Sequence, residues 1–565
     1  MKVSRKSFVA SVGAFAAIRA SGAEKPLWTA GIVTDTHVRR TRESCAKFKM
    51  ACDFFAKKGI DIFVNCGDMA DHYYPEAYPI LKEMSDAAFP SKPPKKIWVY
   101  ANHDRIDRKD EPWEKVFADV KRLLGGTHDF YDVIDMKGWP LVVFPQFLDF
   151  AKAEKILSDV CANPKYAGKP VILFDHVPPR GTTDNSDTWG SEDRMRVYSR
   201  FPRLVHVCGH AHSSLKSELN IWQGAFTVVG MGCLSGWAGH AVGRPPEGKE
   251  SYGAVVLEAF EDRLVFRRFD VRTGCEYSAD APWAVPLPFD PAMAPYRRER
   301  AAKGEPIPQF PAGATLSFKP DSPFTTLSLS CPCAEGPHGT YQYKVEAIAK
   351  KPGAASSRCD VFGQFHLPEG ERKKYAEFRL NAAQFDPGSG YVLRVTPRNC
   401  FGGEGRPLEA EFVAPEPADG FVTLFESRDP MTECPFMSGL KDGERLTAKD
   451  GWYWIGADNY RLTFPDTVWK GAGLYRFTVD MRTVQDSSRT WTMLLRSQFP
   501  KTWNANARIA TLQGDSGMVR YVIEANKKDP KRTCSLLIRE GVKGRIMFGR
   551  VRIDKLAAHC MIRGK

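Results

Sequence analysis

No uninterrupted apolar run in this chain approaches the ~18–20 residues that a membrane-spanning helix needs, so no such helix is expected. The chain also lacks an arginine-rich run and any nucleic-acid-binding module. Its net charge of +13 is spread over 565 residues, which is typical of a solubilising surface that mildly favours anionic substrates. With 43% apolar and 26% charged residues the chain is globular, and its length predicts several domains.

The first 23 residues differ from the rest in having no acidic side chain. They begin with a basic segment (Lys2, Arg5, Lys6), continue with a short apolar stretch, and end with small residues at cleavage-like positions. This pattern predicts a signal peptide over residues 1–23. SRKSF resembles a twin-arginine export signal in which lysine replaces the second arginine. We therefore expect an exported protein, periplasmic or extracellular.

Fourteen cysteines in an exported protein would be consistent with disulfides. Cys66 and Cys208, however, lie within strand-like runs, where a small buried thiol is expected. Pairings that involve Cys359 or Cys400 stay open, because sequence does not determine connectivity.

Two sparse residue types divide the chain. Nine of the 12 histidines lie between His37 and His240, and no tryptophan occurs between Trp283 and Trp452. Apolar strand-like runs alternate with helix-like stretches up to about residue 235, and a hairpin-like segment follows. We therefore predict an α/β domain over residues 24–300, with two central sheets flanked by helices.

In the later half of the chain, short runs in which apolar and polar residues alternate are separated by turn-like segments. This pattern predicts strands, and we expect two β-sandwich domains, over residues 305–416 and 418–565. In the first, FDPGSGYVLRVTPRNCFGGEG resembles the closing part of a fibronectin type III sandwich, with Tyr391 at the tyrosine corner. The second is expected to be jelly-roll-like. Its tryptophans, Trp452, Trp454, Trp469 and Trp503, are interpreted mainly as core residues, with a sugar-stacking platform as the alternative.

Polar side chains stand immediately after the predicted strands of the α/β domain. The strand-like run KKIWVYA, for example, ends in Asn102, His103 and Asp104. Because strand ends meet at one edge of a sheet, seven such groups are expected to converge. They are Asp35, His37, Asp68, Asn102, His176, His210 and His212. Carboxylate, imidazole and amide oxygen together form a ligand set for Mn, Fe or Zn, and seven groups suit two ions that share a carboxylate.

The five ordered blocks DTH (35–37), GDMAD (67–71), NHD (102–104), DHVPP (175–179) and GHAH (209–212) resemble those of the calcineurin-like metallophosphoesterases. The resemblance implies that one metal takes Asp35, His37, Asp68 and His212. It implies that the other takes Asp68, Asn102, His176 and His210, with Asp68 bridging. His103 would be the catalytic histidine, oriented by Asp104. Ala101 departs from the family pattern, which usually has glycine there, and Asp71 is interpreted as a turn or cap residue.

The resemblance implies hydrolysis of a phosphomonoester or phosphodiester by a hydroxide that two transition-metal ions activate. The alternative is an exported surface-binding protein whose β-domains engage glycan or a cell-surface polymer, with the metal domain kept as a scaffold. A degenerate site should have lost ligands, and all seven are present, so Ala101 alone favours this alternative.

Overall fold

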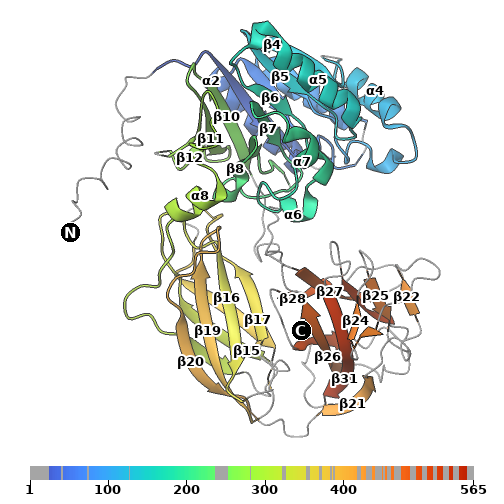
Figure 1. The fold of residues 1–565 in the computed structure, drawn as a ribbon, viewed down its shortest axis with the longest axis vertical. Helices are drawn as coiled ribbons and strands as arrows, with labels where there is room; N and C mark the ends of the chain where they lie inside the picture. Colours follow the sequence, from blue (N-terminus) through green and yellow to red (C-terminus); the bar gives the residue numbers. More distant parts are fainter. Residues whose placement is uncertain are drawn as a thin grey trace. The chain divides into compact units, whose positions relative to one another are not determined.

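The computed structural model describes residues 24–39, 42–72, 75–125, 128–235, 252–279, 281–320, 326–351, 357–367, 372–381, 385, 388–415 and 421–427. Beyond residue 435 it describes the strands named below, mostly as backbone. The chain divides into two compact units, residues 1–301 and 302–565 (Figure 1).

Two sheets form the centre of the first unit. The strands of the first sheet are β1 (Trp28–Val33), β2 (Ile62–Asn65), β3 (Lys95–Trp98), β10 (Gly253–Ala259), β11 (Arg263–Asp270), β12 (Cys275–Tyr277) and β13 (Trp283–Pro286). Their order is β12-β11-β10-β1-β2-β3, with β13 on β11, and β1, β2 and β3 run parallel. The strands of the second sheet are β4 (Asp132–Met136), β5 (Trp139–Val143), β6 (Val171–Phe174), β7 (Leu204–Cys208), β8 (Ile221–Gln223) and β9 (Thr227–Gly230). Their order is β4-β5-β6-β7-β9-β8, and β5, β6, β7 and β9 run parallel.

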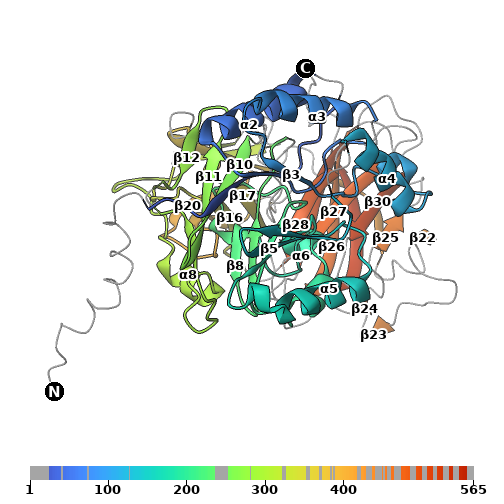
Figure 2. The ribbon, with the colours of Figure 1, turned by 90° about the horizontal axis from the view of Figure 1, so that it is seen from above.

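Helices cover the outer faces of both sheets. They are α2 (Arg42–Lys58), α3 (Ala77–Ala88), α4 (Trp113–Leu123), α5 (Phe150–Ala162) and α7 (Glu192–Tyr198). Two short helices are not part of these layers: α6 (Ser186–Trp189) lies between β6 and α7, and α8 (Arg298–Gly304) has no buried residue. Figure 2 shows α2 and α3 on one side of the sheets and α5 on the other. Side chains of both sheets, such as Ile32 and Val207, share one buried core between the sheets. Two further cores lie under α2, α3 and α4 and under α5 and α7.

This arrangement confirms the predicted α/β sandwich. The strands consist of apolar runs that are buried on both faces, as in β2 and β6, where every residue is buried. The parallel strands of the two sheets end in the loops that carry the DTH, GDMAD, NHD, DHVPP and GHAH blocks.

The second unit consists of β-sheets. A three-stranded and a four-stranded sheet contain β14 (Ser317–Pro320), β15 (Thr326–Pro332), β18 (Tyr375–Asn381), β17 (Ser357–Phe362), β16 (Gln342–Ala349), β19 (Gly390–Arg398) and β20 (Leu408–Val413). Residues of both sheets, including the fully buried Tyr391, form one core. This part is therefore a β-sandwich, as predicted.

Two more sheets follow in the same unit. The first contains β21 (Phe421–Ser427), β23 (Ala448–Lys449), β24 (Trp452–Trp454), β26 (Gly473–Thr483), β29 (Met518–Ala525) and β31 (Ile546–Leu556). The second contains β22 (Phe436–Ser438), β25 (Tyr460–Thr463), β27 (Trp491–Gln498), β28 (Asn506–Leu512) and β30 (Thr533–Ile538). All their described strand pairings are antiparallel, which is typical of the predicted all-β architecture.

Several sequence predictions lie outside the described residues. They are the signal peptide over 1–23, Trp469 and Trp503, and the side chains of Trp452, Trp454 and Cys359. Cys66 and Cys208 are buried free thiols, as expected. Across the described helices, none combines the length and apolar character needed to cross a bilayer.

Candidate metal centre

The loops after β1 and β2 lie side by side and position the first group of ligands. Parallel pairing continues past the strands, because Asp35 N donates to Gly67 O (2.9 Å) and His37 N donates to Asp68 O (3.0 Å). The loops after β6 and β7 are joined in the same way, by Gly209 N donating to His176 O (2.9 Å). These bonds hold the ligand loops in place before any ion binds.

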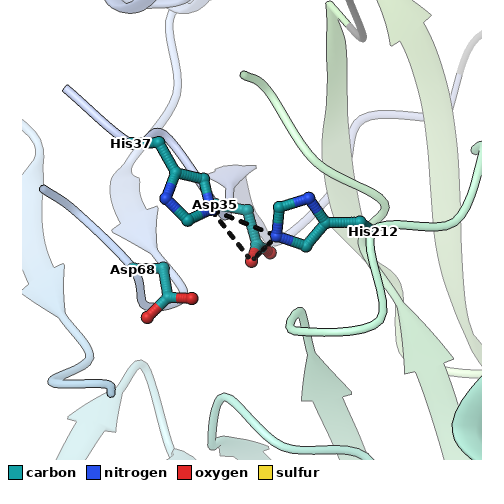
Figure 3. Close-up of side chains that lie close together, drawn as sticks. All are labelled: Asp35, His37, Asp68 and His212. Atoms are coloured by element: carbon teal, nitrogen blue, oxygen red, sulfur yellow. Dashed lines mark hydrogen bonds and ion pairs between the residues drawn. The ribbon is translucent and has the colours of Figure 1, made fainter. Parts of the chain in front are cut away.

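Six of the seven expected ligands form two groups that share Asp68. One group is Asp35, His37, Asp68 and His212, and the other is Asp68, His176 and His210; within each, one ligand atom per residue lies within 4.8 Å of all the others. In Figure 3 the rings of His37 and His212 turn toward the carboxylate of Asp35, with Asp68 on the neighbouring loop. The Nε2 atoms of His37 and His212 are 3.1 Å apart, close enough for both to contact a single ion at ~2.0–2.1 Å.

Buried ligand atoms without hydrogen bonds indicate that a cation fits here. Asp35 Oδ1, Asn102 Oδ1 and His176 Nε2 are buried and make no hydrogen bond of acceptable geometry. Asp35 Oδ1 nevertheless lies 2.9 Å from His212 Nε2, and His176 Nε2 lies 3.1 Å from Asp68 Oδ2. Asn102 Oδ1 has no such ion-pair contact, and leaving a buried atom of this kind unsatisfied costs about 1–3 kcal/mol. The donor set of carboxylate, imidazole and amide oxygens suits a divalent transition metal.

In three of the ligands a neighbour holds the second polar atom, so the first is directed at the centre. Asp35 Oδ2 accepts from Thr34 Oγ1 (2.7 Å) and from His210 N (3.1 Å). Asp68 Oδ1 accepts from His103 N (3.0 Å). His176 Nδ1 donates to Cys66 O (2.8 Å), which leaves Nε2 as the ligand atom.

The backbone at the ligands is strained. Asp35, His37, Asp68, His210 and His212 have φ between 42° and 66°, and they are five of the eight described non-glycine residues with positive φ. Each such residue costs roughly 1–3 kcal/mol, and this strain concentrates at functional sites. Two motif glycines are required by close approach. A Cβ on Gly67 would lie 2.3 Å from His176 Nδ1, and one on Gly209 would lie 1.9 Å from Thr34 Oγ1.

The charges of the protein without ions suit cation binding. Burial alone would raise the pKa of Asp35, but the neighbouring His212 and His176 hold it well below its ordinary value. Burial would likewise raise the pKa of Asp68, yet His176 and His37 lower it overall. Both side chains are therefore carboxylates at neutral pH.

The imidazoles fall into two classes. Burial and the nearby His176 lower the pKa of His210 to about 3, so its ring is neutral as a metal ligand must be. Burial also opposes the charging of His37 and His176, but the adjacent aspartates outweigh it and raise the pKa of each to about 9. An arriving cation has to displace these protons.

Asp71 contacts the site, although the sequence analysis interpreted it as a turn residue. Its Oδ1 lies 3.3 Å from His37 Nδ1, the ring nitrogen remote from the ligand atom Nε2; this is an ion-pair contact without hydrogen-bond geometry. Its Oδ2 forms an ion pair with Arg39. A carboxylate behind a ligating imidazole orients the ring and raises its basicity. Asp71 is therefore the partner that positions His37. The only sequence signal was its place three residues after Asp68.

The expected pairing of His103 with Asp104 is corrected by the structure. His103 Nδ1 contacts the main-chain oxygen of Asp71, and Asp71 Oδ1 lies 3.7 Å away. The buried Asp104 instead accepts from Ala70 N (3.1 Å) and Ala101 N (3.2 Å). Burial, with the nearby Asp68 charge, raises the pKa of Asp104 to about 7. Asp104 therefore ties the β2 and β3 loops together and does not touch the His103 ring.

Ala101 fits without strain. The residue is fully buried, and it is not among the described non-glycine residues with positive φ. The departure from glycine therefore does not distort the loop.

A buried network supports the second group of ligands. Asn102 N donates to Gln146 Oε1 (2.7 Å), and Gln146 O accepts from Arg194 (2.6 Å). Arg194 binds both oxygens of Asp175, at 2.6 and 2.9 Å, and Asp175 directly precedes His176. The network thus joins the backbone of Asn102 to the side chain of the residue that precedes His176. Sequence reasoning missed Gln146 and Arg194, which lie in none of the five blocks.

The α/β sandwich with carboxylates and imidazoles at its strand ends defines a class of metal-binding domain. The family model of the calcineurin-like phosphoesterases matches residues 29–214, which confirms the resemblance. Residues 29–214 thus match this family, and the match together with the ligand groups supports a metal-dependent phosphoesterase.

Solved structures that resemble the chain include a dimetal phosphatase from Danio rerio, with 11% identity, 46% of this chain and 100% of that chain covered, and a TM-score of 0.35. A purple acid phosphatase from yellow lupin seeds shows 14% identity, 46% and 54% coverage, and a TM-score of 0.31. A CBM22 xylan-binding domain from Paenibacillus barcinonensis shows 9% identity, 25% and 99% coverage, and a TM-score of 0.18. At these identities and scores we draw no functional conclusion from them. No curated protein matches the chain.

Proposed function

We propose that the protein is an exported phosphoesterase that uses two transition-metal ions (Mn, Fe or Zn) to hydrolyse a phosphomonoester or phosphodiester. The observation that carries the proposal is the pair of ligand groups that share Asp68, with buried ligand atoms left without hydrogen bonds. Asp35, His37, Asp68 and His212 would hold one ion, and Asp68, Asn102, His176 and His210 the other. Two bound ions would supply charge that polarises a phosphoryl group and makes water a stronger acid.

The chain's own residues account for orientation and proton transfer. His103 lies in the loop after β3, and its side chain is 28% exposed, so a substrate can reach it. Because the Asp71 carbonyl engages Nδ1, Nε2 is the atom that can give a proton to the departing alcohol oxygen. In the reaction, the oxygen of water would bond to phosphorus and release one proton to the solvent. The bond to the alcohol oxygen would break, and that oxygen would receive a proton from His103.

The leader pattern over residues 1–23 supports export, and glycan or polymer binding by the later β-domains stays a prediction. Ala101 is buried and is not among the described non-glycine residues with positive φ, which supports catalysis over the scaffold alternative.

The test combines metal content with turnover. Protein purified with Mn²⁺ or Zn²⁺ should contain close to two ions per chain and hydrolyse para-nitrophenyl phosphate or its bis-ester, and the preferred ester identifies the substrate class. Protein that binds neither metal after reconstitution would contradict the proposal. N-terminal sequencing of secreted protein should begin near residue 24.

A further inference from the structure

An exposed tryptophan stands beside one of the expected ligands. Trp189, at the end of α6, has its ring centroid 5.9 Å from that of His210, with 88° between the ring planes. The residue is 49% exposed, whereas Trp28, Trp98 and Trp139 are at most 1% exposed. Burying an aromatic side chain is strongly favourable. The need to fill the core therefore does not account for Trp189.

The chain holds this tryptophan on a closed loop. A β-bridge between Pro179 and Ser191 joins the two ends of the loop. Within it, Ser186 Oγ donates to Thr183 O (2.7 Å) and accepts from Thr182 N (2.9 Å). The indole therefore stands on a preformed support.

The same loop is fixed to the ligand loop after β7. Asn185 adopts a left-handed conformation (φ 64°) directly before α6, and its Nδ2 donates to Ala211 O (3.2 Å). Ala211 lies between His210 and His212. A rearrangement of the Trp189 loop would therefore strain the ligand loop, and the indole stays close to the centre.

The near-perpendicular rings leave an aromatic surface available. An imidazole at 88° covers at most one face of the indole, so the other face can accept a flat ring by stacking. A phosphoryl group bound at the ligand groups would lie beside His210, so its alcohol portion could reach the neighbouring indole. Base–aromatic stacking of this kind is sequence-tolerant and strong enough to determine substrate preference.

We propose that Trp189 forms a stacking subsite for an aromatic ring in the alcohol portion of the phosphoester, such as an aryl group or a nucleobase. The inference rests on the proposed phosphoesterase function and names its substrate class. Trp189 contacts the non-reacting part of the substrate and has no role in proton transfer.

Binding and turnover test the subsite separately. On the metal-loaded full chain, calorimetry should show that Trp189→Ala weakens binding of phenylphosphonate about tenfold. Binding of methylphosphonate, which has no ring, should change by less than about twofold. Phosphonates are not hydrolysed, so this comparison is independent of activity. Trp189→Phe should keep most of the affinity, since it retains a ring.

Turnover should follow the same pattern. For Trp189→Ala, KM should rise about tenfold for para-nitrophenyl phosphate or for a nucleoside monophosphate. Both kcat and the kinetics with glycerol phosphate should stay near wild type. A higher KM for either ring-bearing ester supports the subsite. Which of the two esters shows the larger increase indicates whether the subsite prefers an aryl group or a nucleobase. Comparing variant with wild type on each ester cancels differences in leaving group.

The matched control is Trp113→Phe, which alters a partly buried tryptophan on α4 that packs against Phe117 and Phe130. It should leave all these values unchanged. Equal losses with and without a ring, or loss of bound metal in Trp189→Ala, would show an effect through His210 and overturn the subsite. Unchanged phenylphosphonate binding would also overturn it. If wild type hydrolyses no ester yet Trp189→Ala still weakens phenylphosphonate alone, the proposed reaction fails and the subsite stands.

Discussion

Replacing Asp71 by alanine should weaken one metal site and leave the other unaffected. The Asp71 carboxylate reaches His37 Nδ1 at 3.3 Å, behind the ring nitrogen that faces His212 and Asp35. His37 belongs to the first ligand group and not to the second. Without the carboxylate, the His37 ring loses both its orientation and the charge that raises its basicity.

The expected magnitude follows from burial. The side chains of Asp71 and His37 are only 11% and 8% exposed, so water does not replace the lost contact. Loss of such an orienting partner typically weakens metal binding by ~10–100-fold, or about 1.4–2.7 kcal/mol. The side chain of Arg39, the other partner of Asp71, is 61% exposed, and solvent screens its ion pair. Arg39→Gln is therefore the matched control, with an expected change under about threefold.

The assay is a calorimetric titration of the metal-free protein with Zn²⁺ at fixed pH. Performed in a His176→Ala background, it should report only the ion of the first group. Because His103 contacts the main-chain oxygen of Asp71, the substitution should leave that contact intact. Wild-type affinity in the Asp71→Ala protein, or an equal loss for the control, would refute the orienting role.

Four further outcomes are expected. Asp68→Ala should lose both ions together in elemental analysis, because both ligand groups contain this carboxylate; retention of one tightly bound ion would exclude a bridging role. His103→Ala should keep both metal ions while kcat falls by ~10²–10⁴-fold, whereas His176→Ala should lose one ion. If His103→Ala lost metal and His176→Ala did not, His103 would be the ligand and His176 the catalytic histidine. Arg194→Met should lower the free energy of unfolding, measured in urea, by about 3–5 kcal/mol. The reason is that Arg194 is 5% exposed and that the carboxylate of Asp175 would remain buried without its partner. A change under about 1 kcal/mol would show that this ion pair is not maintained in solution. Burial lowers the pKa of His206 to about 4. Between pH 6.5, its ordinary pKa, and pH 4 the unfolded state therefore binds more protons than the folded state, and lowering the pH should reduce the free energy of unfolding by up to about 1.4 kcal/mol per pH unit. If a His206→Gln variant loses stability at the same rate in this pH range, the acid sensitivity belongs to other groups.

The sheets and the ligand groups were predictable because they depend on short-range patterns. Buried strands appear in the sequence as continuous apolar runs, and the polar block after each run marks the strand end. Asp35 and His37 after β1, and His210 and His212 after β7, follow this rule. Convergence then follows from parallel strands that end at one edge of each sheet.

The partners behind the ligands were not predictable in this way. The contact between Asp71 and His37 depends on the path of two adjacent loops, and a carboxylate three residues after Asp68 is equally suited to a turn. Asp104 adjoins His103 in sequence, and that adjacency favoured the wrong partner. Its carboxylate points instead to the backbone of Ala70 and Ala101. Neighbours in sequence after a strand end point in different directions, so spacing alone does not determine their contacts.

Left-handed backbone is concentrated at the ends of the strands that carry the expected ligands, where five of the eight described non-glycine residues with positive φ lie. Left-handed backbone at Asp35, Asp68 and His210 costs free energy that the fold itself does not require. Unsatisfied buried atoms such as Asn102 Oδ1 add a further cost at the same place. The five sequence blocks therefore preserve a local geometry that is unfavourable for folding alone. A cation bound to these atoms would offset part of that cost, and this connects the strain in the loops to the proposed chemistry of the site.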